Sequence, residues 1–550
     1  MQRSNTQEPG GDGRIGLSAV LVYPNTRDVA LASLGFLKVY RLLEDRLQLA
    51  DISYLPGPDD QIVSPKQGLL LGEISGVEVS KFDIVAFSIS YENDYVHAVD
   101  LLLKAGIPPL AADRVHPPGI ATDRVEPAGL AGDRGDRYPL VVVGGFTMSL
   151  NPLPVGDLAD VVVVGEFEAV ADRLLETIGE CRVSGTARPG LLERLASIEG
   201  IYVPSLGEQP VKRVWCETGR IADLVTTPVP HGDPSRHGLP RRDTPGSRPG
   251  SHFGDMFLVE VGRGCGRGCL FCAAGSIYRP VRMREAGSIL ESIGSSARVG
   301  LVGTAVGDHP ELIAILDGLL SEGRAAGLSS LRADQITPEL VDRLIKFGIR
   351  TITIAPEAGT DSLRQRIGKR ITGDQITDAV RIFSGAGIRN IKLYFMIGLP
   401  GETDEDIEAI VSLVTRLAKI RGKSRLSVAA GAFVPKPHTA FQWAGFAPRD
   451  TLRRRIRLLR PISGLKGCTL KVNSIDGAWT EAVLARGDRS LSAALIEAAS
   501  TGKPLRTVLR KAGYDPCREL DTAKPLPWDF LRLGVSREGL LKQYQKAFEA

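Results

Sequence analysis

The segment that decides how this chain folds and works is residues 260–272, Glu-Val-Gly-Arg-Gly-Cys-Gly-Arg-Gly-Cys-Leu-Phe-Cys. Three of the seven cysteines lie in it, Cys265, Cys269 and Cys272, with the spacing Cys-x3-Cys-x2-Cys. Soft thiolates select iron–sulfur clusters or zinc. Structural zinc usually takes four protein ligands in paired spacing, and an ordinary iron–sulfur cluster also takes four cysteines. Three local cysteines therefore favour a four-iron cluster with one iron open to a further ligand, and a structural zinc site is the alternative.

Around this segment the sequence alternates between apolar stretches and helical patterns. Six strands are predicted, over residues 256–262, 299–303, 328–331, 351–355, 390–397 and 426–433. Six strands of this kind fit a partial parallel barrel of the (β/α)6 type, smaller than the eight-stranded TIM barrel. We place this barrel at residues 253–447, and we expect ligands at the carboxyl ends of its strands.

The Cys-x3-Cys-x-aromatic-Cys pattern, with Phe271 in the aromatic position, resembles the hallmark of the radical SAM superfamily. The resemblance implies a 4Fe-4S cluster on Cys265, Cys269 and Cys272, whose open iron binds S-adenosylmethionine. It further implies that one electron passes to the sulfonium, that cleavage yields a 5′-deoxyadenosyl radical, and that a reductant such as flavodoxin or ferredoxin supplies the electron. The residues that the resemblance assigns to S-adenosylmethionine are Phe271, Gly303, Arg332, Glu357, Arg364, Ile397 and Gly398.

These assignments differ in chemistry. The stretch ending at Gly303 lacks the acidic residue usual at that place in the superfamily, so a contact there is expected from the backbone alone. Glu357 and Arg364 offer a carboxylate and a guanidinium for the ribose hydroxyls and the methionine carboxylate. For Arg364, a solvated ion pair at the start of a helix is the alternative. Ile397 and Gly398 lie in a stretch that resembles the fifth-strand motif packing the adenine.

Residues 15–204 predict a separate doubly wound, Rossmann-like α/β domain. Its strands are expected over residues 17–23, 49–55, 82–89, 139–143 and 161–164. They are rich in Val and Ile without clean alternation, as in a parallel sheet that is buried on both faces.

Two motifs in this domain resemble the cobalamin-binding domains that precede many radical SAM domains. They are Val-Val-Val-Gly-Gly at residues 141–145 and Gly-Glu-Phe-Glu at residues 165–168. The resemblance assigns Gly144, Gly145, Gly165 and Glu166 to cobalamin, because glycine lets the backbone approach a bulky ligand. The usual Asp-x-His-x-x-Gly motif for the lower ligand of cobalt is absent. A domain that has lost the cofactor and only shapes the substrate pocket is the alternative.

The remaining segments complete the predicted organisation. We expect a disordered tail over residues 1–14, a low-complexity insertion over 111–136, an exposed linker over 205–252 and a mainly helical region over 448–550. The insertion repeats Asp-Arg every ten residues, and the linker is rich in Pro, Gly, Arg and Ser.

Composition narrows the class of protein. The 550 residues are 43% hydrophobic and 24% charged, which is ordinary for a globular chain, and the formal net charge is +4. No apolar run has the length of a membrane span, and the polar N-terminus lacks the apolar core of a signal peptide. We expect a cytoplasmic protein that uses neither a membrane nor a nucleic acid as partner.

The sequence thus predicts a radical SAM enzyme, with cobalamin-dependent methyl transfer or C–H functionalisation of an unknown substrate as its reaction. RNA methylthiolation is a second possibility, because residues 433–443 resemble a stretch of methylthiotransferase barrels. It is disfavoured because residues 15–204 contain only Cys181, whereas a second cluster needs three ligands. A non-catalytic adaptor that binds a cluster or zinc is a third.

Overall fold

The computed structural model describes residues 13–57, 60, 62–64, 67–114, 138–217 and 256–549. The predicted tail before residue 13, most of the predicted insertion and the part of the predicted linker after residue 217 lie outside this range. Within the described part of the chain, no helix combines the length and apolar character needed to cross a membrane.

The N-terminal region forms a six-stranded sheet in the order β2-β1-β3-β4-β5-β6. Its strands are β1 (Ile15–Tyr23), β2 (Leu47–Tyr54), β3 (Ile84–Ser88), β4 (Leu140–Gly144), β5 (Val161–Val163) and β6 (Ile201–Tyr202). The first five strands are parallel, and β6 is antiparallel to β5. This order reverses direction between β1 and β3, which is the point where doubly wound sheets bind ligands.

Helices cover both faces of this sheet, as its Val-rich strands require. One face packs against α2 (Leu34–Arg46), α4 (Ala171–Val183) and α5 (Arg188–Ala196). The other face packs against α3 (Tyr95–Lys104), which in turn contacts α16 (Leu491–Thr501) of the C-terminal region. The predicted doubly wound domain is confirmed.

The second β/α unit contains two four-stranded sheets, with the orders β11-β10-β8-β9 and β12-β13-β14-β15. The strands are β8 (Phe257–Arg263), β9 (Arg282–Met283), β10 (Arg298–Gly303), β11 (Ala325–Leu328), β12 (Thr351–Glu357), β13 (Asn390–Ile397), β14 (Arg425–Ala432) and β15 (Cys468–Val472). A parallel bridge between Leu331 and Ile354 joins the two sheets. The predicted partial parallel barrel is present, with its third strand three residues earlier than the predicted range 328–331, and β15 extends it by a seventh strand.

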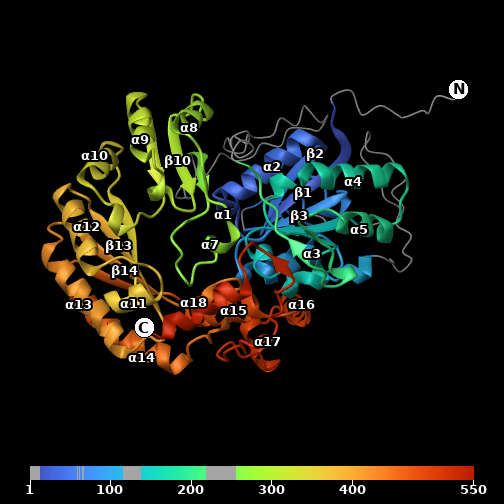
Figure 1. Cartoon of the computed structure of the whole chain (residues 1–550). Helices are drawn as coiled ribbons and strands as arrows, with labels where there is room; N and C mark the ends of the chain where they lie inside the picture. Colours follow the sequence, from blue (N-terminus) through green and yellow to red (C-terminus); the bar gives the residue numbers. More distant parts are fainter. Residues whose placement is uncertain are drawn as a thin grey trace.

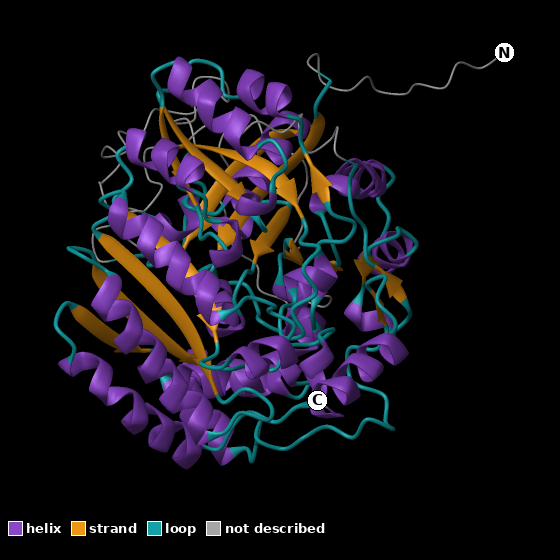
Figure 2. Cartoon of the chain, turned by 60° about the vertical axis from the view of Figure 1, so that its left-hand side comes forward, coloured by secondary structure: helices purple, strands orange, loops and turns teal. Residues whose placement is uncertain are grey.

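Helices line the outer side of this barrel (Figure 2). They include α9 (Leu312–Ser321), α10 (Pro338–Lys346), α12 (Gly373–Gly385) and α13 (Asp404–Ile420). Their starts follow from the sequence: Thr337 caps α10 ahead of Pro338, and Thr372 with Gln375 forms a capping box on α12.

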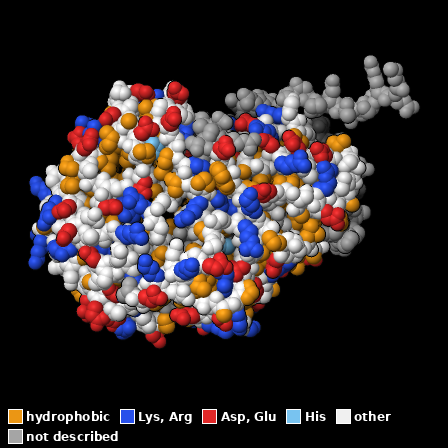
Figure 3. All heavy atoms as spheres, in the orientation of Figure 1, with side chains coloured by type: hydrophobic (Ala, Val, Ile, Leu, Met, Phe, Trp, Pro, Cys, Tyr) orange, Lys and Arg blue, Asp and Glu red, His pale blue; other side chains and the backbone are white. Residues whose placement is uncertain are grey.

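The C-terminal region connects the two units. Its helices are α14 (Arg449–Leu459), α15 (Ile475–Arg486), α16, α17 (Leu505–Lys511) and α18 (Arg537–Glu549). Figure 1 shows the N-terminal sheet on the right, the barrel on the left, and these helices below and between them. Figure 3 shows acidic and basic side chains interspersed over the visible face, in keeping with the small net charge.

Two predicted boundaries are wrong. The linker was expected from residue 205, but β7 (Val211–Lys212) pairs with β16 (Leu531–Arg532), and Cys216 is buried. The insertion was expected from residue 111, but Arg114 is buried and forms an ion pair with Asp160, with 3.2 Å between Nη2 and Oδ2. In both places a few residues pack onto the fold before the Pro-rich and Gly-rich composition begins.

Candidate functional site

The three clustered cysteines lie on the loop that leaves β8. Gly264 opens this loop with φ at +94°, and a Cβ there would lie 2.3 Å from the carbonyl oxygen of Tyr278. The Gly264 N–H donates to Oγ1 of Thr304, at 3.1 Å, just past the end of β10. All three cysteines are partly exposed, and none forms a disulfide. The glycine and this hydrogen bond hold the loop at the carboxyl ends of β8 and β10.

The thiols in this loop fit a metal cluster. Burial raises the pKa of Cys269 to about 11, although the charge of Lys369 opposes the shift, and burial also raises the pKa of Cys272. Bound metal supplies the positive charge that stabilises such thiolates. Among the described residues, no three Cys, His, Asp or Glu side chains surround one point as a single metal ion requires. Three thiolates that hold different irons of one cluster do not need to share a point.

A second segment packs against the cysteine loop, at residues 367–369 after helix α11 (Asp361–Arg366). The N–H of Leu270 donates to the carbonyl oxygen of Ile367 at 3.0 Å. Gly368 approaches so closely that a Cβ there would lie 2.8 Å from the carbonyl oxygen of Gly268. This contact places Lys369 beside Cys269.

Lys369 pairs with Glu357 at the end of β12, with 3.0 Å between Nζ and Oε1. Burial raises the pKa of Glu357, and the charge of Lys369 opposes that shift. Glu357 has a φ of +70°, which is strained for a residue with a side chain. Such strain commonly marks functional positions. A carboxylate and an ammonium group therefore lie together at the strand end that faces the cysteine loop.

A cavity of about 340 Å³ lies at the carboxyl edge of the N-terminal sheet. One wall comes from the ends of β1, β3, β4 and β5, and the opposite wall from the ends of β8 and β10 with Ile277 and Tyr278. Gly144, Gly145, Gly165, Glu166 and Gly303 all line it. The residues predicted for cobalamin and one residue predicted for S-adenosylmethionine thus share a single cavity.

At two of these positions glycine is required by the neighbouring backbone, whereas the sequence predicted that glycine serves the close approach of a ligand. Gly145 has a φ of +111°, and a Cβ there would lie 2.4 Å from the carbonyl oxygen of Ile89. Gly165 has a φ of +117°, and a Cβ there would lie 2.1 Å from the carbonyl oxygen of Val214. Neighbouring backbone therefore already requires glycine at both positions, whether or not a ligand is bound.

Glu166 sits in a buried ionic network at the base of the cavity. Arg282 donates to both of its oxygens, at 2.6 and 2.8 Å, and Nη1 of Arg263 lies 2.9 Å from Oε2. The N–H and the thiol of Cys216 also donate to Oε2, at 2.9 and 3.1 Å. Burial alone would raise the pKa of Glu166, but the bonds from Arg282 and the charge of Arg263 outweigh it and lower the pKa to about 2. Glu166 is therefore a fixed anion.

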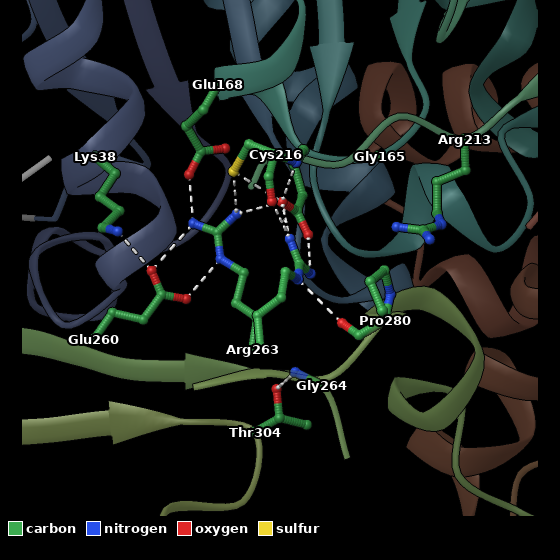
Figure 4. A network of polar contacts seen from close by, with 12 residues as sticks. Lys38, Gly165, Glu168, Arg213, Cys216, Glu260, Arg263, Gly264, Pro280 and Thr304 are labelled. Atoms are coloured by element: carbon green, nitrogen blue, oxygen red, sulfur yellow. Dashed lines mark hydrogen bonds and ion pairs between the residues drawn. The ribbon is translucent and has the colours of Figure 1, made fainter. Parts of the chain in front are cut away.

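Arg263, two residues before Cys265, joins the two units of the chain. Figure 4 shows its guanidinium between Glu168 of the N-terminal region and Glu260 of β8. Its Nε lies 2.6 Å from Glu260 Oε1. Lys38 of α2 completes the arrangement, with Nζ 2.5 Å from Glu260 Oε2. The network fixes the strand that carries the cysteine loop against the N-terminal sheet.

Comparison with known proteins agrees with this architecture. Residues 259–414 match the family model of the radical SAM superfamily, and residues 35–121 and 127–204 match a model described as the N-terminal region of radical SAM proteins. The chain belongs to the radical SAM superfamily.

Two known proteins are similar to this chain in sequence. An uncharacterized protein of Methanocaldococcus jannaschii is 29% identical over 420 residues, which are 75% of this chain and 80% of the relative. A tRNA-2-methylthio-N(6)-dimethylallyladenosine synthase of Cereibacter sphaeroides is 25% identical over 299 residues, which are 47% of this chain and 65% of that enzyme.

Two solved structures share the fold. The radical S-adenosylmethionine methyltransferase TsrM from Kitasatospora setae, with tryptophan and a SAM analog bound, has a TM-score of 0.50 and 14% identity. The match covers 78% of this chain and 74% of TsrM. The cobalamin-dependent S-adenosylmethionine radical enzyme OxsB, with aqua-cobalamin and S-adenosylmethionine bound, has a TM-score of 0.50 and 17% identity, over 92% of this chain and 65% of OxsB.

Within the radical SAM domain, the structure does not support the role predicted for Arg364. This side chain is buried, and its Nε donates to the carbonyl oxygen of Ile371 at 2.9 Å. Its terminal nitrogens bind the carbonyl oxygen of Ala358 and the carboxylate of Asp361. Because these groups occupy its donors, Arg364 holds the turn between α11 and α12 and is not free for a methionine carboxylate.

The other residues predicted for S-adenosylmethionine are spread over the strand ends. Arg332 binds Asp334 with two bonds of 3.0 Å and also donates to the carbonyl oxygen of Lys369 at 3.3 Å. Ile397 is fully buried in the core, so only its backbone can reach a ligand. Phe271 is partly buried and packs against a group of hydrophobic side chains that includes Ala358, Leu363 and Leu399.

Gly398 is held by a buried acid. Its N–H donates to Oε2 of Glu402 at 2.6 Å, and Nη1 of Arg455 lies 2.6 Å from the same oxygen. Burial raises the pKa of Glu402 to about 7, although the charge of Arg455 opposes this. Gly398 has a φ of +86°, and a Cβ there would lie 2.8 Å from Cβ of Ala447. The glycine lets the turn after β13 pack against the segment leading into α14.

Sequence reasoning missed Lys369, Arg263, Arg282 and Lys38 as members of the site. Arg263 could have been suspected from its place two residues before Cys265. Lys38 lies in α2, Arg282 in the short strand β9 and Lys369 in a loop, and no motif surrounds any of them, so only the fold shows what they face.

Proposed function

We propose that this radical SAM enzyme holds a four-iron cluster on Cys265, Cys269 and Cys272, and that it binds cobalamin in the cavity between its two units. When a reduced cluster and S-adenosylmethionine are bound, they supply reductive cleavage of the sulfonium to methionine and a 5′-deoxyadenosyl radical. Cobalamin supplies a methyl carrier. The reaction we propose is methyl transfer to, or functionalisation of, an unactivated C–H bond of a substrate.

The cavity is the observation that carries the cobalamin proposal. It lies where the strand order of the N-terminal sheet reverses, and doubly wound domains bind their ligands at such points. Its opposite wall belongs to the strands that carry the cysteine loop and Gly303. A cofactor in this cavity would therefore face the radical SAM domain, as a methyl carrier requires. The volume is within the ~300–1,000 Å³ of small-molecule sites, and because the cavity is partly open, a larger ligand can extend from it.

The residues of this chain would divide the work. Ser88 and Ser149 line the sheet edge with hydroxyl groups that can donate to a ligand, and the oxygen of Ser149 also accepts from the N–H of Gly165 at 3.0 Å. Arg263 and Glu166 fix the position of this edge relative to the cysteine loop. No histidine is among the described residues that line the cavity, so the lining offers no imidazole for the lower face of cobalt.

Two features of the radical SAM domain support cleavage of S-adenosylmethionine beside the cysteine loop. The cysteine loop provides thiolates, and Lys369 and Glu357 provide a charged pair beside them. A one-electron reductant of the flavodoxin or ferredoxin class would supply the electron.

RNA methylthiolation is supported by the likeness to the Cereibacter sphaeroides synthase and by the resemblance of residues 433–443 to methylthiotransferase barrels. Only Cys181 and Cys216 precede the cysteine loop in the whole sequence, which leaves too few ligands for a second cluster of the usual kind. Cys181 is buried in α4 and Cys216 in the ionic network, so the two cysteines lie in different surroundings.

The test is to produce the protein with hydroxocobalamin supplied and to record its visible spectrum after anaerobic purification. We expect cobalamin to remain bound to the natural protein and to fall about tenfold in Ser88→Trp, whose indole would fill the cavity. Ser184→Trp, on the exposed end of α4, is the control and should retain the cofactor. Iron content should stay the same in all three proteins, which shows that they are folded. A natural protein without cobalamin, or equal retention in Ser88→Trp, would contradict the proposal.

A further inference from the structure

The sheet β12–β15 has an inner face that is polar and open. Along β13, Leu393 and Phe395 are buried against the helices on the outer side, so Lys392 and Tyr394 point to the opposite side. The same alternation holds on β14, where Val428 is buried and Ser427 is partly exposed. The inner side chains therefore line the interior of the partial barrel.

The strand register sorts these inner residues into rows that run across the sheet. One row contains Thr353, Lys392, Ser427 and Thr469. The next row, nearer the carboxyl ends, contains Tyr394, Ala429 and Lys471, and the register between β12 and β13 shifts at this level. The hydroxyl of Thr469 lies 3.4 Å from that of Ser427, which confirms that both point to the same side.

The first row can recognise an oxyanion. Lys392 lies between the hydroxyls of Thr353 and Ser427. Ammonium and hydroxyl donors together suit a carboxylate or a phosphate. Within the described part of the chain, neither Lys392 nor Lys471 makes an ion pair or a side-chain hydrogen bond.

The inner face also carries an excess of positive charge. Glu357 is the one acidic residue on strands β12 to β15, and its carboxylate binds Lys369. Among the residues that the structure describes, Lys392, Lys471 and Arg425 form no ion pair with an acidic side chain.

The second row provides an uncovered aromatic ring. Tyr394 is 43% exposed, which is unusual for an aromatic residue in the middle of a sheet. Its partner on β14 is Ala429, whose small side chain leaves the ring uncovered on that side. Lys392 lies two residues before it, about 7 Å along the strand, and Lys471 lies two strands away, about 10 Å across the sheet.

We infer that this inner face binds the substrate, and that the substrate carries a carboxylate or phosphate group together with a planar ring. This inference rests on the proposed function, because it places the substrate inside the barrel below the cysteine loop. The ring stacks on Tyr394, and the anionic group lies near Lys392, about 7 Å away, or near Lys471, about 10 Å away.

The experiment measures binding of simple probes to the holoenzyme, reconstituted without oxygen, by isothermal titration calorimetry. The probes are phenyl phosphate, benzoate, inorganic phosphate and the neutral benzamide. We expect either phenyl phosphate or benzoate to bind more tightly than benzamide, and the tighter of the two identifies the anionic group.

Four variants locate the site. Lys392→Gln and Lys471→Gln should each weaken the better anion about tenfold, as loss of a charged hydrogen bond implies. Tyr394→Leu should weaken the aromatic anion but leave inorganic phosphate unchanged. Lys423→Gln removes an exposed charge just before β14 and is the matched control, which should bind like the natural protein.

Several results would overturn the inference. They are equal binding of benzamide and the anions, unchanged binding in both lysine variants, or the same loss in Lys423→Gln. Release of 5′-deoxyadenosine and retention of cobalamin are measured on the same preparations. If the enzyme releases 5′-deoxyadenosine and retains cobalamin but the probes do not bind, the inference fails and the proposed function stands. If the probes bind as expected but 5′-deoxyadenosine is not released and cobalamin is not retained, the proposed function fails.

Discussion

Removing the charge of Glu166 should weaken the junction between the N-terminal sheet and the radical SAM domain. The carboxylate is buried and holds Arg282 at 2.6 and 2.8 Å and Arg263 at 2.9 Å. Glu166→Gln keeps the size of the side chain and removes its charge, so two buried guanidinium groups lose their shared anion. Breaking a buried ion pair in this way typically costs about 3–5 kcal/mol.

The lowered pKa of Glu166 gives a second value for the contribution of this carboxylate to the free energy of unfolding. A pKa lowered from the ordinary 4.5 to about 2 corresponds to roughly 3 kcal/mol of stabilisation by the ionised form. Because the pKa is lowered in the folded state, this stabilisation is present at every pH above about 4.5. It is lost only as the pH falls toward about 2.

Differential scanning calorimetry of the anaerobic protein is the assay. A loss of about 3 kcal/mol should lower the transition that includes the N-terminal sheet by roughly 6–12 °C, for a unit of 150–250 residues. The difference should be the same at pH 8 and at pH 6, since both lie above 4.5. Glu193→Gln, an exposed substitution on α5, is the control and should not shift this transition. A shift of less than 2 °C in Glu166→Gln would refute the reasoning.

Two further substitutions test other parts of the fold. Gly145→Ala should lower the thermal midpoint clearly more than Gly144→Ala. A Cβ at Gly145 would lie 2.4 Å from the carbonyl oxygen of Ile89 with φ at +111°, whereas a Cβ at Gly144 would lie 3.7 Å from Cβ of Val163. Equal midpoints in the two variants would contradict this prediction. Burial lowers the pKa of His438 to about 3, so its neutral form stabilises the fold above pH 6.5 and that contribution falls on acidification. Lowering the pH from 7 to 5 should therefore cost about 2 kcal/mol through His438. His438→Asn, which tolerates the φ of +56°, should reduce this pH dependence in denaturant unfolding, and an unchanged dependence would disprove the role of the imidazole.

Much of the fold could be predicted because it rests on local patterns. The Val-rich strands of the N-terminal sheet and five of the six barrel strands lie close to their predicted ranges, whereas β11 begins and ends three residues before its predicted range. β15 was missed because Cys468–Val472 is short and mixes polar with apolar residues. Its place in the sheet depends on pairing with β14, which no local pattern encodes.

The site was predictable only where a motif carried it. The cysteine spacing and the glycine pairs locate the loop and the cavity. The roles of individual side chains depend on what lies opposite them after folding. Arg364 turns inward to carbonyl oxygens, Glu166 binds arginines of the other unit, and Lys369 reaches Glu357.

The cluster itself is tested most directly by anaerobic reconstitution with iron and sulfide, followed by reduction with dithionite in the presence of S-adenosylmethionine. We expect about four irons per chain and release of 5′-deoxyadenosine from the natural protein. A variant with Cys265, Cys269 and Cys272 all replaced by alanine should lose both, whereas Cys517→Ala, at a partly exposed cysteine outside this loop, should keep both. Zinc in place of iron, or S-adenosylmethionine that stays intact after reduction, would contradict the account.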